Sequence, residues 1–203
     1  MYPYNTESAI EIVTERNKLD EYIDFINANN ISQAWIVMPN LEFLKECPTL
    51  KYLNVSPSYN APETFSFSPL YDMKEIKYLV CNNVYGDKEE FWVELDCKKI
   101  KGLEFLSVSF NKGIVNLSKI KNLKTLRIRD YKCKEKDLRN LFESKVLDTI
   151  ELTECGIQSL NGIEQSEMMQ CIYLNYNRTL KDISRLEKVK NTLKTLHIES
   201  VLK

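Results

Sequence analysis

Apolar residues recur along the chain in short groups of the form apolar-x-x-apolar-x-apolar, separated by more polar stretches. Clear copies begin at seven residues, Leu50, Ile76, Leu103, Leu123, Leu147, Met169 and Leu193, and a weaker copy begins at Ile31. From Ile31 onward the starts lie 19, 26, 27, 20, 24, 22 and 24 residues apart. Because side chains alternate between the two faces of a strand, the later apolar residues of each copy point to one face and their neighbours to the other.

Self-similarity at this period is typical of a leucine-rich repeat architecture. We expect each copy to supply one strand of a parallel sheet, and neighbouring repeats to close a common core. The sequence therefore predicts a single α/β domain, a right-handed leucine-rich repeat solenoid with a parallel concave sheet. Its convex side would mix 3₁₀ turns and short helices. Residues 1–30 would form an N-terminal helical cap, and residues 31–203 about eight irregular repeats.

The stretches between the copies have apolar residues at every third position. Residues 114–123, 157–163 and 180–189 all show this spacing. A period of three favours 3₁₀ turns or short tight helices over a regular α-helix. Asn111 and Asn177 each lie eight residues after the start of a copy, where we expect a buried side-chain amide to bond to the backbone of a turn.

Two repeats are long, and each contains an additional alternating apolar segment. Phe65 and Phe91 both lie 15 residues after the start of their copies. The equal offsets predict two short strands side by side on the outer face, with Phe65 beside Phe91 and Phe67 beside Val93. A pair of unrelated loops is the alternative.

The two ends of the chain differ in pattern. Ser8-Ala9-Ile10-Glu11 fits a helix capping box, and the apolar residues from Ile10 to Ile26 follow helical spacing. We expect an amphipathic helix within residues 8–29 that covers the first edge of the core, with a partner-binding helix as the alternative.

Only five residues follow Ile198, so the last strand has little to protect its edge. The last repeat is then truncated, disordered or paired with another molecule, and the sequence leaves all three open. Weak self-association through the C-terminal edge strand is therefore among the expected interactions.

Composition excludes several classes of partner. The formal net charge is −1 and 43% of the residues are hydrophobic, which gives no reason to expect nucleic acid or a membrane surface as partner. The sequence shows no secretion signal and no membrane-spanning run, so we expect a cytoplasmic protein.

The cysteines are expected to fill the core rather than to bind a metal. The chain has six cysteines and one histidine and contains no Cys-x-x-Cys pair, so we expect no metal site and no cofactor. Cys81 and Cys155 fall at core positions of their repeats, and Cys47 precedes a strand. Reduced, structural thiols are the expected state in the cytoplasm.

With these residues in view, the chain resembles the internalin-type leucine-rich repeats of bacterial proteins over about residues 31–200. It departs from that pattern where Ser58, Val84, Tyr131 and Val201 replace an Asn. The resemblance implies the fold and a bacterial protein. Internalins are exported and linked to the cell wall, and the chain lacks those features, so their host-receptor function does not carry over.

The residues between the buried leucines should form columns on the concave face. Its first half collects the aromatic residues Trp35, Tyr52, Tyr78 and Phe105, and its second half carries Arg127, Arg129, Glu151, Tyr173 and Tyr176, together with Asp130 and Glu154. Aromatic residues and arginine are enriched at interaction hot spots, and exposed aromatics indicate a patch that a partner covers. The alternatives are aromatics that pack on one another or beneath the N-terminal segment, and a simple ion pair between Arg127 and Glu151.

The sequence thus predicts a non-enzymatic module that binds a protein partner through its concave face. A bacterial immunity protein that neutralises a cognate toxin, and the repeat domain of a secreted effector or enzyme, are the alternatives. We expect no catalytic residue. His197 is the only histidine and looks like an ordinary strand residue. Cys133 has a basic setting that could activate a thiol, but a solvated turn is the plainer interpretation.

Overall fold

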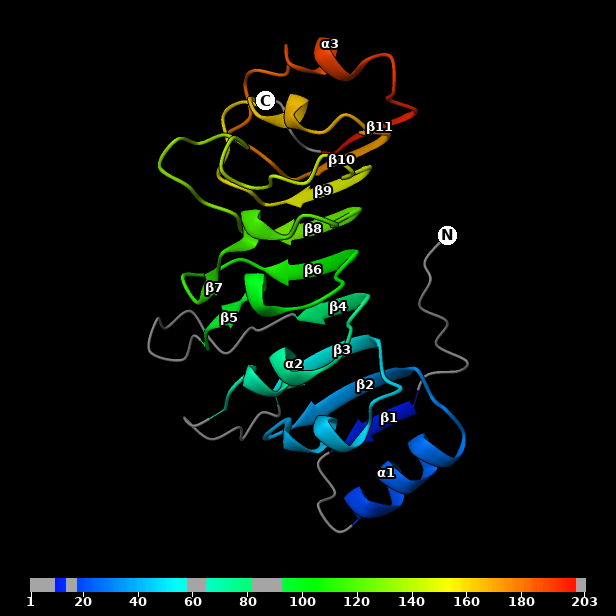
Figure 1. The fold of residues 1–203 in the computed structure, drawn as a ribbon. Coiled ribbons are helices and arrows are strands. Elements are labelled where there is room, and N and C mark those ends of the chain that lie inside the picture. The colour runs from blue at the N-terminus through cyan, green and yellow to red at the C-terminus, as the bar shows by residue number, and fades with distance from the viewer. Residues whose placement is uncertain (1–9, 14–17, 58–64, 82–92, 200–203) are drawn as a thin grey trace.

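The protein is described from a computed structural model over residues 10–13, 18–57, 65–81 and 93–199 (Figure 1). It has an α/β fold with one open, parallel sheet and few helices. The sheet contains nine strands in the order β1-β2-β3-β4-β6-β8-β9-β10-β11, so each strand pairs with the sheet strand that precedes or follows it along the chain. Their bounds are β1 (Ile10–Val13), β2 (Gln33–Met38), β3 (Tyr52–Pro57), β4 (Tyr78–Cys81), β6 (Phe105–Ser109), β8 (Thr125–Arg129), β9 (Thr149–Thr153), β10 (Cys171–Asn175) and β11 (Thr195–Glu199).

The apolar residues of the repeated groups line one face of the sheet, which we call the covered face. Leu53, Leu79 and Leu106 lie directly beside one another on β3, β4 and β6, and all three are fully buried. Ile150 and Ile172 continue the row on β9 and β10 and are also fully buried. The prediction that these positions turn into a shared core is confirmed.

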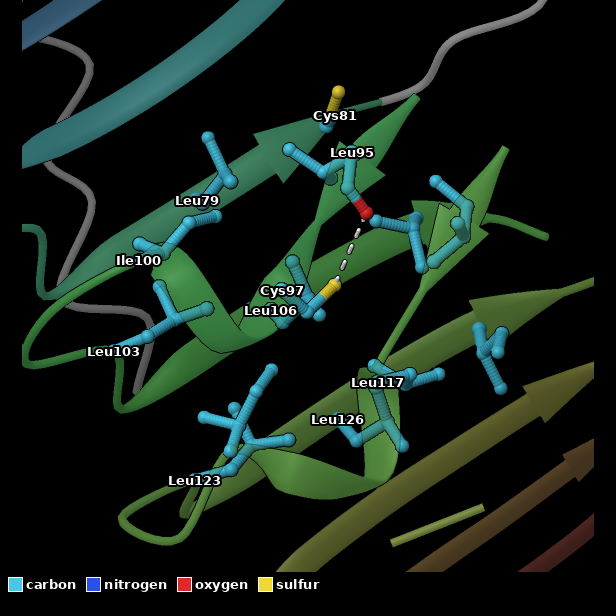
Figure 2. Packing of buried hydrophobic residues seen from close by; sticks show 14 of the residues in the cluster. Leu79, Cys81, Leu95, Cys97, Ile100, Leu103, Leu106, Leu117, Leu123 and Leu126 are labelled. Atoms are coloured by element: carbon cyan, nitrogen blue, oxygen red, sulfur yellow. Dashed lines mark hydrogen bonds between the residues drawn. The ribbon is translucent and has the colours of Figure 1, made fainter. Parts of the chain in front are cut away.

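The connections between the strands pack on the covered face and form the second layer of the core. They contain the 3₁₀ turns η3 (Glu42–Glu46), η5 (Cys97–Lys99), η6 (Leu117–Lys119) and η7 (Ile163–Gln165) and the short helices α2 (Ser68–Asp72) and α3 (Leu186–Val189). The tight turns agree with the period of three in the sequence. Figure 2 shows Ile100 and Cys97 of the connections near Leu79 and Leu106 of the strands, and Leu117 beside Leu126.

A second, two-stranded sheet lies within the connections. Its strands β5 (Leu95–Asp96) and β7 (Ile114–Val115) pair in parallel. The Asp96 amide N–H donates to the Tyr71 hydroxyl at 2.7 Å, and Asn116 donates to the Asp96 carboxylate at 2.8 Å. This bond from Asn116, with those from the backbone of Lys98 and from Lys99, holds the pKa of the Asp96 carboxyl below its ordinary value.

The prediction of a strand at Phe65 and Phe67 is wrong. Phe67 is the N-cap residue of α2, and Pro69 occupies the first turn of that helix. Both phenylalanine rings are buried and meet edge to face at 5.1 Å, so packing of two large rings outweighs the local alternation. Phe91 lies outside the described residues, and Val93 is not part of a strand.

The N-terminal end is closed by a strand and a helix together. The prediction of a helix is wrong for residues 10–13, which form β1 parallel to β2 with Ile10 beside Ala34. This segment is rich in β-branched residues, and pairing with β2 satisfies backbone groups that a helix start would leave free. Ser8 and Ala9 of the expected capping box lie outside the described residues.

The helical part of the N-terminal cap is confirmed at α1 (Leu19–Ala28), which lies at the β1 end of the molecule (Figure 1). Ile26 is fully buried and Ile23 is 9% exposed, so this face of α1 belongs to the core. The Asn27 side chain donates to the Glu46 carbonyl at 2.9 Å and ties the end of α1 to η3.

The C-terminal end has no comparable cover in the described part of the chain. β11 pairs with β10 and stands last in the sheet. Leu196 and Ile198 occupy covered-face positions beside Ile172 and Leu174, which are fully buried. Yet Leu196 is 42% and Ile198 40% exposed, because no further strand lies beside them among the described residues.

Asn177 behaves as the sequence predicts, and Asn111 does not. The Asn177 side chain is fully buried, donates to the Leu152 carbonyl at 2.8 Å and accepts from the Cys155 amide at 2.8 Å. Asn111 is only half-buried, and its side-chain oxygen accepts from the Gly113 amide at 2.8 Å. It closes its own turn instead of joining two repeats.

All six cysteines have free thiols. Burial raises the pKa of Cys47 to about 11 and the pKa values of Cys97 and Cys155 to about 12. Burial also raises the pKa of Cys81. These four thiols therefore stay protonated at neutral pH and fill the core, as the sequence predicts for Cys47, Cys81 and Cys155.

Candidate functional site

The face of the sheet opposite the covered face, which we call the open face, carries the side chains that alternate with the buried leucines. Strand register arranges them in three columns, as the sequence predicts. The first column runs Gln33, Tyr52, Tyr78, Phe105, Thr125, Thr149, Cys171 and Thr195. The second runs Trp35, Asn54, Val80, Ser107, Arg127, Glu151, Tyr173 and His197. The third pairs Val37 with Ser56 and continues through Ser109, Arg129, Thr153, Asn175 and Glu199. Asn82, expected in the third column, lies outside the described residues.

Three aromatic residues of the first column contact one another across adjacent strands. The rings of Tyr78 and Phe105 stack with their centroids 3.9 Å apart and their planes 9° from parallel. The Tyr52 ring lies 6.5 Å from that of Tyr78. The guanidinium carbon of Arg127 lies 5.5 Å from the Phe105 ring centroid, so the stack continues into a cation–π contact.

The expectation that the aromatic residues form an exposed row is wrong for Tyr78 and Phe105. These side chains are only 6% and 7% exposed, and Tyr52 is half-buried. Neighbouring strands stand about 4.8 Å apart, which allows flat rings on adjacent strands to stack and shield each other from water. The Tyr78–Phe105 stack is therefore a structural part of the open face.

Trp35 and Tyr173 are more accessible aromatic residues of the second column. Trp35 lies beside Asn54 and is 44% exposed. Tyr173 is half-buried, and its ring centroid lies 6.2 Å from that of His197. A large indole exposed on a regular strand is typical of a contact surface.

Arg127 and Glu151 meet near the middle of the open face. They lie side by side on β8 and β9, with the Arg127 Nε 3.2 Å from the Glu151 Oε2. Both side chains are less than a third exposed, at 27% and 28%. The ion pair expected as an alternative is thus present, and it orients the guanidinium group over Phe105.

Two shallow hollows open on this face. The larger, of about 510 Å³, is lined by Phe105, Thr125, Arg127, Thr149, Glu151, Cys171, Tyr173, Asn175, His197 and Glu199. The smaller, of about 380 Å³, is lined by Ser107, Val108, Ser109, Arg127, Ile128, Arg129, Glu151 and Thr153. Arg127 and Glu151 line both, so the ion pair is shared by the two hollows.

Asn175 is a residue of the larger hollow that the sequence did not single out. Its Nδ2 group donates to Glu151 Oε1 at 3.4 Å, a long bond. Its Oδ1 atom is buried and has no hydrogen-bond partner within the described part of the structure. The column position of Asn175 was predictable, but the unmet acceptor depends on side-chain geometry and leaves no signal in the sequence.

A row of residues with left-handed backbone follows three of the strands. Asp130, Glu154 and Tyr176 come directly after β8, β9 and β10 and have φ values of 60°, 55° and 58°. This conformation is unfavourable for residues other than glycine. Their amide N–H groups still extend the sheet, with that of Asp130 donating to the Thr153 carbonyl at 3.0 Å.

The side chains of this row form part of the rim of the open face. Arg129 Nη1 lies 3.3 Å from Glu154 Oε2, and both side chains are exposed. The Tyr176 hydroxyl donates to Glu199 Oε1 at 2.7 Å, which raises the pKa of Tyr176 above its ordinary value. The predicted binding residues Arg129, Tyr173 and Tyr176 thus gather at one end of the face, away from Trp35 and its neighbours on β2 and β3.

The residues considered for catalysis are not brought together. His197 is exposed, and its Nε2 lies 3.9 Å from Glu199 Oε2 on the same strand. Cys133 is half-buried in a connection, and its thiol donates to the Asp137 carbonyl at 3.3 Å. The described residues contain no group of three or more His, Cys, Asp or Glu side chains placed to hold a metal ion.

Within the described ranges, no helix has both the length and the apolar character needed to cross a bilayer. The sequence matches no protein-family model, and no curated protein is significantly similar to it.

Proposed function

We propose that this chain is a leucine-rich repeat solenoid that recognises a protein partner through its open face and catalyses no reaction. The sequential parallel strands, the buried leucine rows and the tight turns between them all support this architecture. The buried free thiols support a reducing, cytoplasmic location as part of the same proposal.

The observation that carries the proposal is the register of the open face. Eight consecutive strands present their outward side chains in direct register, so the groups that would contact a partner are already in place. A pre-formed surface of this kind loses little conformational entropy on binding. Stacking of Tyr78 on Phe105 and of Phe105 on Arg127 fixes the middle of the surface further.

The two parts of the open face favour different contacts with the partner. Around β2 and β3, the exposed Trp35 and half-buried Tyr52 offer an apolar, aromatic contact area. Aromatic residues supply much of the binding energy at protein interfaces. This part would hold an apolar protrusion of the partner.

Around β8 to β11 the open face is polar and has an excess of acceptors. Its carboxylates and those of the rim are Asp130, Glu151, Glu154 and Glu199, against the two cations Arg127 and Arg129. The buried Oδ1 atom of Asn175 adds an unmet acceptor. This composition favours a partner that presents lysine, arginine or other donors to the larger hollow.

The proposal is tested by capturing the partner from cells that naturally produce the protein. Trp35→Ala combined with Tyr52→Ala removes the accessible aromatic groups and keeps the Tyr78 and Phe105 rings, which stack on each other. We expect at least a tenfold loss in captured partner, because hot-spot aromatics carry about 2 kcal/mol or more each. The matched control is Phe25→Ala, which removes a 51% exposed aromatic ring from α1.

Circular dichroism on the same variants shows whether the fold is intact. A partner retained at full level by the folded double variant, or lost equally in Phe25→Ala, would rule out the aromatic part of the open face. Glu151→Gln with Glu199→Gln then tests the polar part separately, and unchanged capture there would remove the basic partner surface from the proposal.

A further inference from the structure

The outer edge of β11 combines two features that soluble sheets normally avoid. Within the described residues no strand pairs with this edge, so its backbone groups are available for pairing. The covered-face side chains Leu196 and Ile198 are also 42% and 40% exposed. An accessible strand edge with apolar side chains is a template for another strand.

The rest of the last repeat enlarges this apolar surface. Ile183 is 37% exposed, and Leu186 and Leu193 are only partly buried against the core. All three lie in the segment that leads from β10 to β11, so they belong to the same end of the molecule.

We propose that β11 pairs antiparallel with β11 of a second copy of this chain, around a two-fold axis at His197. The strand sequence is self-complementary in that arrangement. With His197 opposite its own counterpart, Leu196 lies opposite Ile198 and Thr195 opposite Glu199, each pair occurring twice. A two-fold axis perpendicular to the sheet makes the same patch meet itself, which gives a closed dimer.

This register keeps the apolar side chains of both copies on one face of the joined sheet and the polar side chains on the other. Residues directly opposite in an antiparallel pair point to the same side. Leu196 and Ile198 of both copies therefore meet on the covered face and continue the leucine rows across the axis. A shift by one residue would place Leu196 opposite His197 and send apolar and polar groups to the wrong sides.

The polar residues of β11 are complementary in the same register. The Thr195 hydroxyl can donate to the Glu199 carboxylate of the other copy. His197 at the axis lies near Glu199 of its own strand, with Nε2 and Oε2 3.9 Å apart, and diagonally across from the second Glu199. No like-charged carboxylates face each other directly.

The opposite end of the sheet, at β1, carries a helix. There α1 packs Ile23 and Ile26 into the core beyond β1 (Figure 1). Tail-to-tail pairing leaves this helix in place. The open faces of both copies point to the same side in such a dimer and stay accessible.

The first test measures molar mass by sedimentation over a dilution series of the full chain. We expect a reversible change between the 23.8 kDa chain and twice that mass. Leu196→Lys and Ile198→Lys should each raise the dissociation constant at least tenfold, because they place charges in the joined core. Val146→Lys is the matched control, since Val146 is 43% exposed in a different repeat, and it should leave the dimer unchanged.

The second test reads the register directly by disulfide formation. His197→Cys should give a cross-linked dimer under mild oxidation, because only this residue of β11 faces itself across the axis. Thr195→Cys alone should not cross-link, whereas Thr195→Cys with Glu199→Cys should. The wild-type chain, oxidised in parallel, gives the background from its native cysteines.

A strictly monomeric wild-type chain at every concentration would overturn the proposal. So would a dimer that persists in the folded Leu196→Lys and Ile198→Lys variants, or one that cross-links through Thr195→Cys but not through His197→Cys. These outcomes are independent of partner capture by the aromatic part of the open face, because β11 pairing leaves Trp35 and Tyr52 untouched.

Discussion

The two ends of the sheet differ in the burial of the apolar residues described there. At the β1 end, α1 contributes Ile26, which is fully buried. At the β11 end, Leu196 and Ile198 stand beside fully buried partners on β10 and yet are 42% and 40% exposed. The same apolar pattern therefore contributes a different amount of buried surface, and a different stabilisation, at different places in the sheet.

Breaking the closed end should give the largest effect. We expect Ile26→Ala to lower the free energy of unfolding by about 3 kcal/mol, since it removes fully buried methyl groups and leaves a cavity. Chemical denaturation followed by circular dichroism measures the change. Phe25→Ala on the exposed side of the same helix should cost less than about 1 kcal/mol, and equal losses for both variants would mean that α1 does not seal the core.

The open end should respond much less to the same kind of truncation. Leu196→Ala is expected to cost about 1 kcal/mol or less, because the residue is already 42% exposed. Ile172→Ala, one strand inward in the same row, should cost about 3 kcal/mol. Denaturation at a concentration low enough to give monomer compares the two, and similar losses would contradict the difference between the ends.

Acid should weaken the ion pairs centred on Lys77. Glu75 contacts Lys77 at 2.9 Å and Lys51 at 3.1 Å, and Glu104 contacts Lys124 at 2.6 Å and Lys77 at 2.8 Å. These bonds hold the pKa values of both glutamates below their ordinary value of 4.5. Their stabilisation is therefore complete above about pH 4.5 and is lost as the pH falls through the lower folded values.

The same contacts raise the pKa of Lys77, so its contribution is lost only in strongly alkaline solution. Melting temperatures between pH 6 and pH 2.5 measure the acid effect. Glu104→Gln should reduce the steepness of this decline, and an unchanged profile in that variant would show that the ion pairs do not contribute.

The smallest expected effect concerns an exposed side-chain contact at the C-terminal end of the sheet. There Lys194 donates to the neutral side chain of Gln170 at 2.8 Å instead of to a carboxylate. Gln170→Glu supplies the missing charge and should stabilise this end by about 0.3 kcal/mol at low salt, as expected for an exposed pair. Hydrogen exchange of β11 amides measures the gain, which should vanish in about 1 M salt.

Much of the fold follows from the sequence because each strand and turn can be predicted from nearby residues and from the adjacent copies of the pattern. The strand positions and the three columns depend on alternation and on spacing between copies, and both are visible in residues such as Leu53, Leu79 and Leu106. The tight turns are predicted by apolar residues at every third position. The role of Asn177 is predicted by its place eight residues after the start of its copy. Each of these signals is local or repeats at a regular interval.

The errors arose where non-local packing decided between local alternatives. Residues 10–13 form a strand because β2 offers an edge, which the helical spacing of the segment does not reveal. Phe65 and Phe67 precede a helix because their rings are buried together. The burial of Tyr78 and Phe105 depends on ring orientation across two strands, and the unmet acceptor of Asn175 on a side-chain angle, so neither leaves a trace in the sequence.

The position of Trp35 gives the molecule a built-in optical reporter. The chain has two tryptophans, and Trp35 is 44% exposed on the open face. Whatever settles over β2 and β3 would dehydrate this indole and move its emission to shorter wavelengths. With Trp92 replaced by phenylalanine, binding to this surface is measured as a shift in the fluorescence emission of Trp35, and no dye has to be attached.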